Sequence, residues 1–180
     1  TLDAKLLAIQ RSNGEVAWTA KLEDYKKGYS GTSSPLIVGD MVVTGIAGGE
    51  YGARGFVDAY DTDTGTMLWR RYTVPSEGEK GVETWAGDSW KTGGGPTWAI
   101  GTYDPQSNTL YWPVGNPSPD WNGDVREGDN LYTNSVLALE PETGEMKWYF
   151  QFTPHDMWDY DATNGLVIDD IVVDGKTVRA

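Results

Sequence analysis

Residues 59–69 read Ala-Tyr-Asp-Thr-Asp-Thr-Gly-Thr-Met-Leu-Trp, and the same pattern recurs at residues 8–18 and 138–148. Each copy begins with Ala, has Gly at its seventh position and ends with Trp. Asp, Asn and Gly favour a tight turn, and the closing Trp is a large apolar side chain suited to packing. The pattern therefore predicts a strand, a turn and a second strand. A degenerate copy, with Asn in place of Gly, occupies residues 102–112.

The spacing of these copies predicts the fold class. The steps from Trp18 to Trp69, to Trp112 and to Trp148 are 51, 43 and 36 residues. A repeat of roughly 40 to 50 residues of short strands is typical of β-propeller blades. We expect an all-β chain that forms about four blades of a β-propeller.

Two further hairpins are predicted, over residues 36–43 and 171–178, because short turns are flanked there by β-branched residues. No stretch has a convincing helical period. Since a propeller closes as a ring of up to about eight blades, we expect residues 1–180 to be an internal segment of one propeller domain, truncated at both ends.

Composition excludes several classes of partner. The chain has 14 Lys and Arg against 27 Asp and Glu, for a net charge of -13, and no Cys. Such a charge repels nucleic acid and anionic membranes, so cations are the more natural partners. We find neither an apolar run long enough to cross a bilayer nor a signal peptide, and the lack of Cys does not distinguish one compartment from another.

An acidic segment near the C-terminus, residues 154–161, reads Pro-His-Asp-Met-Trp-Asp-Tyr-Asp. Asp159 and Asp161 lie two positions apart, so on a strand or a strand-end loop their side chains point to one side. Two such carboxylates repel each other unless a cation or a proton intervenes. The segment is a candidate site for a hard metal ion, or for a base beside a metal ligand, and the alternative is a solvated acidic loop.

Two glycine-rich segments are further candidates. Residues 48–55 place Glu50 among glycines, which suits metal or polar recognition, although a bulge with a surface Glu would look the same. The run Gly93–Gly95 before Trp98 is costly in a regular strand, so we expect close approach of another group to its backbone. A dinucleotide loop is disfavoured because neither G-x-G-x-x-G nor a following helix is present.

Two polar residues complete the candidates. Asn116, in Val-Gly-Asn-Pro-Ser-Pro at residues 114–119, offers an amide oxygen, a usual ligand of hard cations, although Asn-Pro alone is simply a turn. Thr32 lies in Gly-Thr-Ser-Ser-Pro at residues 31–35, where a hydroxyl could bind a carboxylate or merely form a turn.

Together, the repeats and the segments between them resemble the pyrroloquinoline quinone (PQQ)-dependent alcohol dehydrogenases, the periplasmic methanol and ethanol dehydrogenases, over all 180 residues. The resemblance implies an eight-bladed propeller. Its repeat is similar to the family's tryptophan-docking motif, in which each Trp packs between neighbouring blades. Non-enzymatic propellers also use that motif, so the segments between repeats carry the functional signal.

By this resemblance, Thr32, Gly48, Gly49 and Trp98 bind the cofactor, with Trp98 as the floor under its rings. The implied metal ligands are Glu50, Asn116, Asp159 and Asp161. Asp159 is also the implied catalytic base.

The resemblance implies oxidation of a primary alcohol to an aldehyde by hydride transfer to PQQ, with a metal ion as Lewis acid. Calcium-dependent relatives have a small residue at the position of Asp161 and lanthanide-dependent relatives have Asp, which favours a lanthanide over Ca²⁺. A cytochrome c acceptor, a periplasmic location and a possible homodimer are also implied. We expect the segment alone to be inactive, because a cysteine pair and a basic residue of the family site lie outside it.

The alternative from another class is a non-catalytic scaffold propeller of the outer-membrane assembly type. A scaffold predicts that Glu50, Trp98, Asn116 and Asp159 are scattered. The enzyme hypothesis requires them to converge, and it also accounts for the Gly93–Gly95 run.

Overall fold

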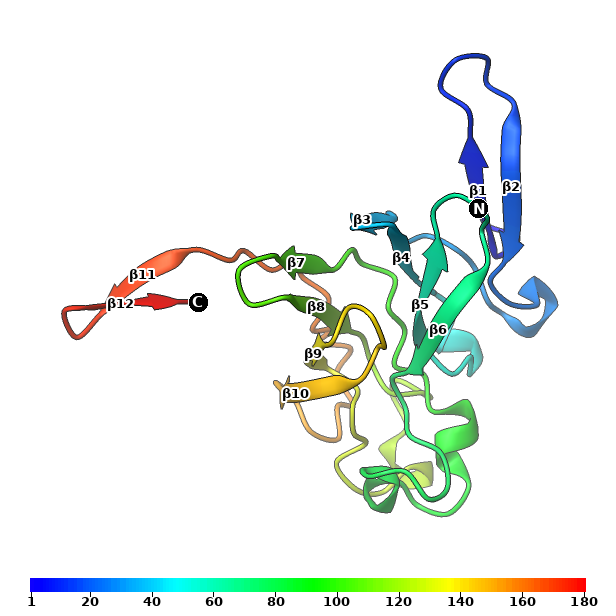
Figure 1. The fold of residues 1–180 in the computed structure, drawn as a ribbon. Coiled ribbons are helices and arrows are strands. Elements are labelled where there is room, and N and C mark those ends of the chain that lie inside the picture. The colour runs from blue at the N-terminus through cyan, green and yellow to red at the C-terminus, as the bar shows by residue number, and fades with distance from the viewer.

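A computed structural model describes residues 1–180 as β-strands joined by loops and short 3-10 helices (Figure 1). The strands are β1 (Lys5–Ile9), β2 (Val16–Lys21), β3 (Leu36–Val38), β4 (Met41–Gly45), β5 (Phe56–Asp61), β6 (Met67–Tyr72), β7 (Thr102–Asp104), β8 (Thr109–Val114), β9 (Ser135–Leu139), β10 (Met146–Gln151), β11 (Asp170–Val173) and β12 (Lys176–Arg179). The 3-10 helices are η1 (Tyr25–Lys27), η2 (Gly49–Tyr51), η3 (Val82–Thr84), η4 (Ser89–Thr92) and η5 (Gly123–Val125). None of these helices has the length and apolar character needed to span a membrane.

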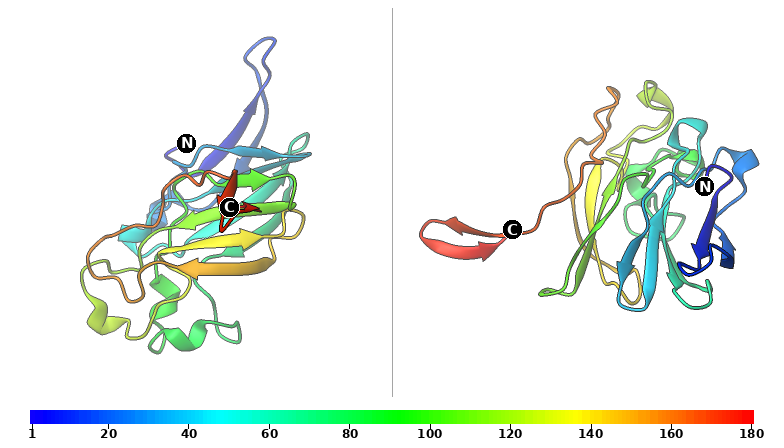
Figure 2. Two further views of the ribbon diagram at one scale, coloured as in Figure 1. Left: turned by 90° about the vertical axis from the view of Figure 1, so that its left-hand side faces the viewer. Right: turned by 90° about the horizontal axis from the view of Figure 1, so that it is seen from above.

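The strands form four antiparallel sheets. Two are complete four-stranded blades in the orders β3-β4-β5-β6 and β10-β9-β8-β7, and the others are the two-stranded hairpins β1-β2 and β11-β12. The complete blades lie side by side, with the β1-β2 hairpin next to the first and the β11-β12 hairpin projecting beyond the second (Figures 1 and 2). This architecture confirms the β-propeller prediction, with two complete blades and two half-blades.

The repeated tryptophans dock each blade onto the next. Trp18 Nε1 donates a hydrogen bond to the Thr62 carbonyl at 2.9 Å, and Trp69 Nε1 donates to the Pro141 carbonyl at 2.9 Å. Each indole also covers the turn glycine of the following repeat: a Cβ added to Gly65 would lie 2.5 Å from Trp18, and one added to Gly144 would lie 2.5 Å from Trp69. The predicted docking function of the repeat is confirmed.

The degenerate repeat at residues 102–112 does not dock one blade onto the next. It forms the β7-β8 hairpin, which belongs to the same sheet as the repeat at residues 138–148. Its Trp112 is fully buried within that blade instead of docking onto another one. The prediction that this copy marks a blade of its own is wrong, because β8 pairs with β9 and the two repeats share one sheet. The other two predicted hairpins are confirmed as β3-β4 and β11-β12.

The hydrophobic core fills the spaces between blades. One cluster joins the two complete blades and includes Val43, Val57, Leu110, Trp112 and Leu137, all fully buried. Burial of each such side chain contributes roughly 1.5 to 3 kcal/mol. A second cluster packs the β1-β2 hairpin onto the first complete blade. Burial between sheets therefore holds the blades in place.

Arg70 reinforces the contact between the first hairpin and the first complete blade. Its Nε donates to Asp58 Oδ1 at 2.7 Å, its Nη1 to Glu23 Oε2 at 3.1 Å and its Nη2 to the Leu22 carbonyl at 2.6 Å. Since Asp58 is fully buried, Arg70 supplies the counter-charge that this carboxylate needs.

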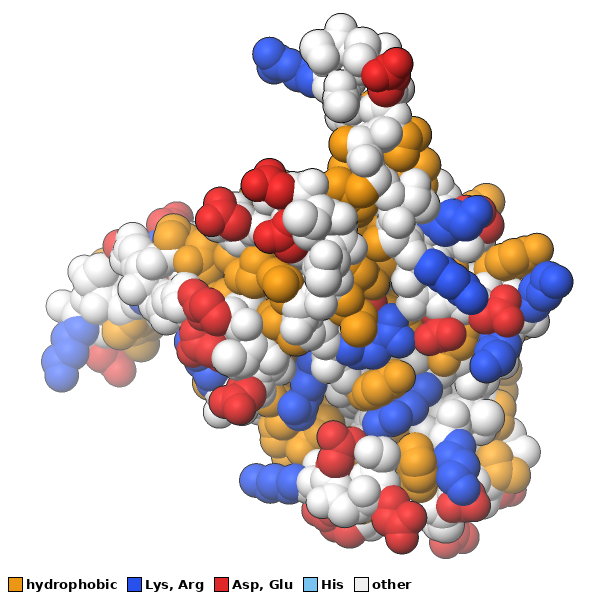
Figure 3. All heavy atoms as spheres, turned by 45° about the vertical axis from the view of Figure 1, so that its right-hand side comes forward, with side chains coloured by type: hydrophobic (Ala, Val, Ile, Leu, Met, Phe, Trp, Pro, Cys, Tyr) orange, Lys and Arg blue, Asp and Glu red, His pale blue; other side chains and the backbone are white.

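The two outer faces of the segment are apolar. Apolar side chains run up the projecting β1-β2 hairpin in Figure 3, where Leu7, Ile9 and Val16 are exposed. At the opposite end, Trp148 and Phe150 of β10 are 47% and 57% exposed. In a propeller such faces pack against further blades.

Candidate metal and cofactor site

The predicted site residues lie in loops at one face of the blades. Because neighbouring strands are antiparallel, β4, β8 and β10 all end at this face. Glu50 lies in η2 after β4, Asn116 directly follows β8, and Asp159 and Asp161 lie in the loop after β10. Chain direction alone thus brings residues from three distant segments to one face.

The segment before β7 joins the two blades at this face. Gly95 N donates to the Asn116 carbonyl at 2.7 Å, and Gly55 N donates to the Gly94 carbonyl at 2.8 Å. Thr97 N donates to the Ile46 carbonyl at 2.8 Å. Residues 94–97 therefore form a seam between the blades, and Trp98 directly follows it.

The glycine run is explained by this seam. A Cβ on Gly94 would lie 2.8 Å from Ser118 N, and one on Gly95 would lie 2.9 Å from Thr73 Oγ1. Both glycines also have positive φ, which L side chains rarely adopt. Close approach to this backbone is confirmed, and the approaching groups belong to the protein itself.

Internal packing also accounts for Gly48 and Gly49. A Cβ on Gly48 would lie 2.3 Å from the Gly28 carbonyl oxygen, and one on Gly49 would lie 2.8 Å from the Pro96 ring. A cofactor contact at Gly48 and Gly49 stays a prediction.

A small cavity of about 20 Å³ lies where these loops meet. It is lined by Gly49, Glu50, Pro96, Trp98, Asn116, Asp120, Asp159 and Asp161. Six of these residues are among the predicted site residues. A cavity of this size has room for about one water-sized species, which suits a single ion. Thr32 is exposed and does not line the cavity, so its contact with a cofactor stays a prediction.

Asn116 connects the two aspartates of the C-terminal loop. Its side chain is buried, its Nδ2 donates to Asp159 Oδ1, and its Oδ1 accepts from Asp161 N at 2.9 Å. No three His, Asp or Glu side chains form a preassembled group that could hold a metal ion. The structure therefore brings carboxylate and amide oxygens to one cavity, and Asn116 links two of the aspartates.

The cavity concentrates negative charge. Burial, followed by the charge of Asp159, raises the pKa of Asp161 to about 6. Burial, followed by the charges of Asp159 and Glu50, raises the pKa of Asp120 to about 6. A cation bound among these carboxylates would relieve the repulsion. An all-oxygen ligand set fits a hard ion such as Ca²⁺ or a lanthanide.

Asp120 is a site residue that the sequence analysis did not identify. It lies between Pro119 and Trp121 in the loop that leaves Asn116, and a single loop aspartate carries no spacing signal.

A buried carboxylate shapes the loop that carries Asp159 and Asp161. Asp156 accepts from Trp158 N at 2.9 Å, from Tyr160 N at 2.9 Å and from Asn134 Nδ2 at 2.5 Å. Asp159 and Asp161 have φ values of 62° and 35°, the left-handed region that is uncommon for residues other than glycine. The segment is a strand-end loop, and both aspartates reach the same cavity.

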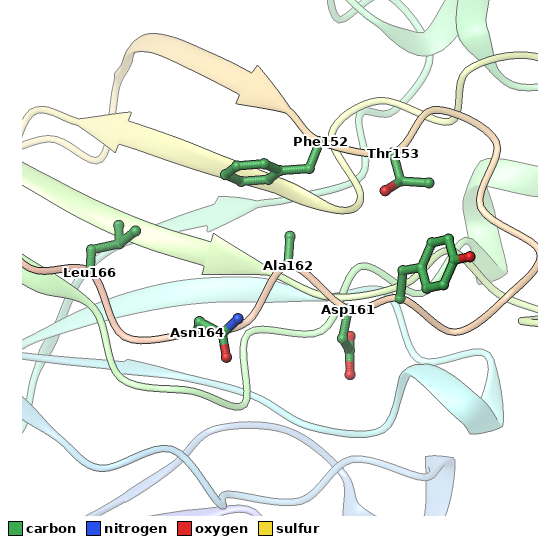
Figure 4. Close-up of a pocket in the computed structure, with 7 residues that line it drawn as sticks. Phe152, Thr153, Asp161, Ala162, Asn164 and Leu166 are labelled. Carbon is green, nitrogen blue, oxygen red and sulfur yellow. The ribbon is translucent and has the colours of Figure 1, made fainter.

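The same loop also borders a second cavity of about 240 Å³ (Figure 4). Its lining is Phe152, Thr153, Tyr160, Asp161, Ala162, Asn164 and Leu166. Figure 4 shows Phe152 and Thr153 on one side and Ala162, Asn164 and Leu166 on the other. Asp161 is the one residue that lines both cavities.

Comparison with known proteins identifies the family of the chain. A family model described as glucose/ethanol/alcohol dehydrogenase, beta-propeller domain, matches residues 3–180. The quinoprotein alcohol dehydrogenase PedH of Pseudomonas putida is 45% identical over 197 aligned residues, which cover 100% of this chain and 33% of the relative. The lanthanide-dependent methanol dehydrogenase of Methylorubrum extorquens is 38% identical over 97% of this chain and 32% of its own length.

A solved structure described as europium-containing methanol dehydrogenase superposes with a TM-score of 0.95 at 37% identity, over 99% of this chain and 34% of that one. The chain thus spans about a third of the length of the proteins it matches. The family match over nearly all of the chain, together with the docked blades and the cavity between their loops, shows that the chain belongs to the PQQ β-propeller family of glucose, ethanol and alcohol dehydrogenases.

Proposed function

We propose that the whole protein is a quinoprotein dehydrogenase that oxidises a primary alcohol to an aldehyde, with PQQ over Trp98 and a lanthanide ion, alternatively Ca²⁺, in the small cavity. The observation that carries the proposal is the convergence of Glu50, Trp98, Asn116, Asp159 and Asp161 on that cavity. A scaffold propeller would have no reason to gather these residues.

The residues around the cavity fit both groups. Glu50, Asn116, Asp159 and Asp161 would hold the ion, since carboxylate and amide oxygens are the ligands that hard cations prefer. Trp98 offers a flat apolar ring beside the cavity and is 40% exposed. Such a ring suits stacking on a planar cofactor.

When bound, PQQ supplies the hydride acceptor and the ion supplies a Lewis acid. Asp159 would act as general base by accepting the hydroxyl proton of the alcohol at a carboxylate oxygen. Its side chain is directed by the hydrogen bond from Asn116 Nδ2, which leaves the second carboxylate oxygen for the substrate. Asp161 would add negative charge on the other side of Asn116.

The number of carboxylates favours a trivalent ion. Glu50, Asp159 and Asp161 together offer three negative charges, and Asp120 adds a fourth at the wall of the cavity. A lanthanide is close to Ca²⁺ in size but carries a higher charge, so it gains more from additional anionic ligands. We assign Asp161 as the residue that selects the ion.

The same proposal includes electron transfer to a cytochrome c, a periplasmic location and a possible homodimer, all of which follow from family resemblance. A pull-down with cytochrome c and sedimentation of the full-length protein would test the two associations.

The test is reconstitution of the full-length apoprotein with PQQ and either La³⁺ or Ca²⁺, followed by a dye-linked assay of alcohol oxidation. We expect Asp159→Asn to lower kcat by about 10² to 10⁴-fold, since the base is lost. Asp161→Ala should abolish the response to La³⁺ and retain activity with Ca²⁺. Asp88→Asn, which changes an exposed aspartate outside the cavity, is the matched control.

Wild-type protein without activity with either ion would overturn the enzyme proposal. Equal Ca²⁺ activity in wild type and Asp161→Ala, with no response to La³⁺, would overturn the choice of lanthanide alone.

A further inference from the structure

Arg126 is fully buried, yet it forms no salt bridge. A buried cation without an ion-pair contact is costly unless hydrogen bonds replace its hydration. All the hydrogen bonds of its guanidinium go to uncharged oxygens, three of them on the backbone. The structure therefore uses this arginine as a multiple hydrogen-bond donor.

The guanidinium joins two segments that are distant in sequence. Its Nε donates to the Pro119 carbonyl at 3.0 Å, and its Nη2 donates to the Asp120 carbonyl at 3.0 Å. The same Nη2 also donates to the Asp156 carbonyl. A single nitrogen atom thus bridges the backbones of Asp120 and Asp156.

The third guanidinium nitrogen, Nη1, fixes the orientation of the Arg126 side chain. Nη1 donates to Asn130 Oδ1 at 2.8 Å, and Asn130 Nδ2 donates back to the Arg126 carbonyl at 2.7 Å. Asn130 is itself fully buried. The planar guanidinium is therefore held from both ends, a geometry that a lysine ammonium does not reproduce.

Both bridged segments contribute to the lining of the small cavity. Asp120 lines the cavity directly, on the loop that leaves Asn116. Asp156 begins the loop that carries Asp159 and Asp161, and its carboxylate fixes the backbone N–H groups of Trp158 and Tyr160. Neither loop belongs to a sheet, so strand pairing does not set the distance between them.

We propose that Arg126 is a positioning residue that sets the separation between Asp120 and the loop bearing Asp159 and Asp161, and thereby the fit of the cavity to its ion. This inference rests on the proposed function. Arg126 does not line the cavity, so it acts through the residues it holds. Without the Arg126 guanidinium, three backbone carbonyls lose their donors, and the link between the two segments through Asn116 remains without this second support.

The experiment uses Tb³⁺ as the probe in full-length protein loaded with PQQ. Luminescence titration gives the Kd for Tb³⁺, and lifetimes in H₂O and D₂O give the number of water molecules on the ion. Arg126→Gln removes the fork, and Arg126→Lys keeps the charge but reaches fewer oxygens. Arg70→Lys is the control, because Arg70 is a partly buried, hydrogen-bonded arginine between the first hairpin and the first complete blade and does not line the cavity.

We expect both Arg126 variants to raise the Kd by about 10 to 100-fold, the usual effect of losing a residue that orients metal ligands. They should also admit about one additional water to the ion, whereas Arg70→Lys should match wild type in both measurements. If Arg126→Gln does not fold, the Kd for Tb³⁺ and the water number of Arg126→Lys decide whether the inference holds.

Two results would overturn the inference while leaving the proposed function intact. One is an unchanged Kd and water number in the Arg126 variants, and the other is an equal change in Arg126→Lys and Arg70→Lys. If wild-type protein does not bind Tb³⁺, the inference and the choice of a lanthanide both fail, whereas the enzyme proposal is decided by the activity assay with Ca²⁺.

Discussion

Gly115 shows how closely the chain packs around a single site residue. A Cβ at this position would lie 2.7 Å from Asp161 Oδ1, closer than side-chain carbons come to other atoms. We predict that Gly115→Ala in the full-length protein pushes the Asp161 carboxylate away from the cavity and raises the Kd for Tb³⁺ by about tenfold or more. A luminescence titration measures this change.

Gly165→Ala is the control for that prediction. Gly165 lies in the segment that follows Asp161, and a Cβ there meets nothing within 4 Å. If both alanine variants bind Tb³⁺ as wild type does, Asp161 has no part in holding the ion.

At this scale, side-chain chemistry marked Glu50, Asn116, Asp159 and Asp161 as candidates, and the family resemblance implied their roles. The structure brings all four to one cavity, and their binding of an ion stays a prediction. Asp120 escaped prediction because its role depends on the loop that Arg126 holds against Asp156. That contact joins residues 30 positions apart and leaves no local pattern.

Among the elements, the docking turn leaves no room for a side chain at its glycine. Gly65 has φ of +69°, and its missing Cβ leaves room for the Trp18 ring. We predict that Gly65→Ala lowers the free energy of unfolding by about 2 to 5 kcal/mol, the sum of left-handed strain and overpacking. Urea unfolding of the full-length protein measures the loss.

Gly39→Ala separates the two causes. Gly39 has φ of +57° in the β3-β4 turn, and a Cβ there meets nothing within 4 Å. Its substitution should cost only the strain, about 1 to 2 kcal/mol. Equal losses of unfolding free energy in Gly65→Ala and Gly39→Ala would show that contact with the Trp18 ring adds nothing to the cost of a Cβ at Gly65.

The β11-β12 hairpin is attached to the blade by an ion pair, and its attachment should depend on pH. Arg179 Nη2 donates to Asp104 Oδ1 at 2.9 Å, and this bond, followed by that from Ser107, lowers the pKa of Asp104 from 3.8 to about 2. A lowered pKa means that the stabilisation is present above about pH 4 and is lost as the pH falls to about 2.

We therefore predict that Asp104→Asn makes stability less dependent on pH between about 4 and 2, as measured by urea unfolding at several pH values. Asp88→Asn, an exposed control, should keep the wild-type slope. A wild-type slope in Asp104→Asn would contradict the assigned role of the ion pair.

Turn chemistry predicted the hairpins well, since Gly and Asn at defined offsets specify a turn locally. It did not assign each hairpin to a sheet. The repeat at residues 102–112 has the local pattern of a docking repeat, yet it pairs into the blade of its neighbour, because strand pairing depends on the whole blade.

At the scale of the whole molecule, apolar side chains are exposed on the two outer faces of the chain. At one of them Trp148 and Phe150 of β10 are exposed, with Phe152 beside them. We predict that the 180-residue chain alone associates with itself at micromolar concentration, because such apolar faces bury themselves where they can. Sedimentation velocity at several concentrations checks this.

Phe150→Glu should reduce the association, whereas Val167→Glu, an 87% exposed residue outside β10, should leave it unchanged. An equal effect of the two substitutions would mean that added charge, and not the β10 face, governs association.

The seam at residues 94–97 lies where the two complete blades meet, next to the residues that line the small cavity. Glu50 belongs to one blade, whereas Asn116, Asp159 and Asp161 belong to the next. An ion shared by these ligands is a cross-link between blades, so its affinity and the closure of the ring are linked reciprocally. Removal of the ion by a chelator should separate the two blades first at this contact. An ion that fits the ligands poorly should leave this contact the least stable one between blades.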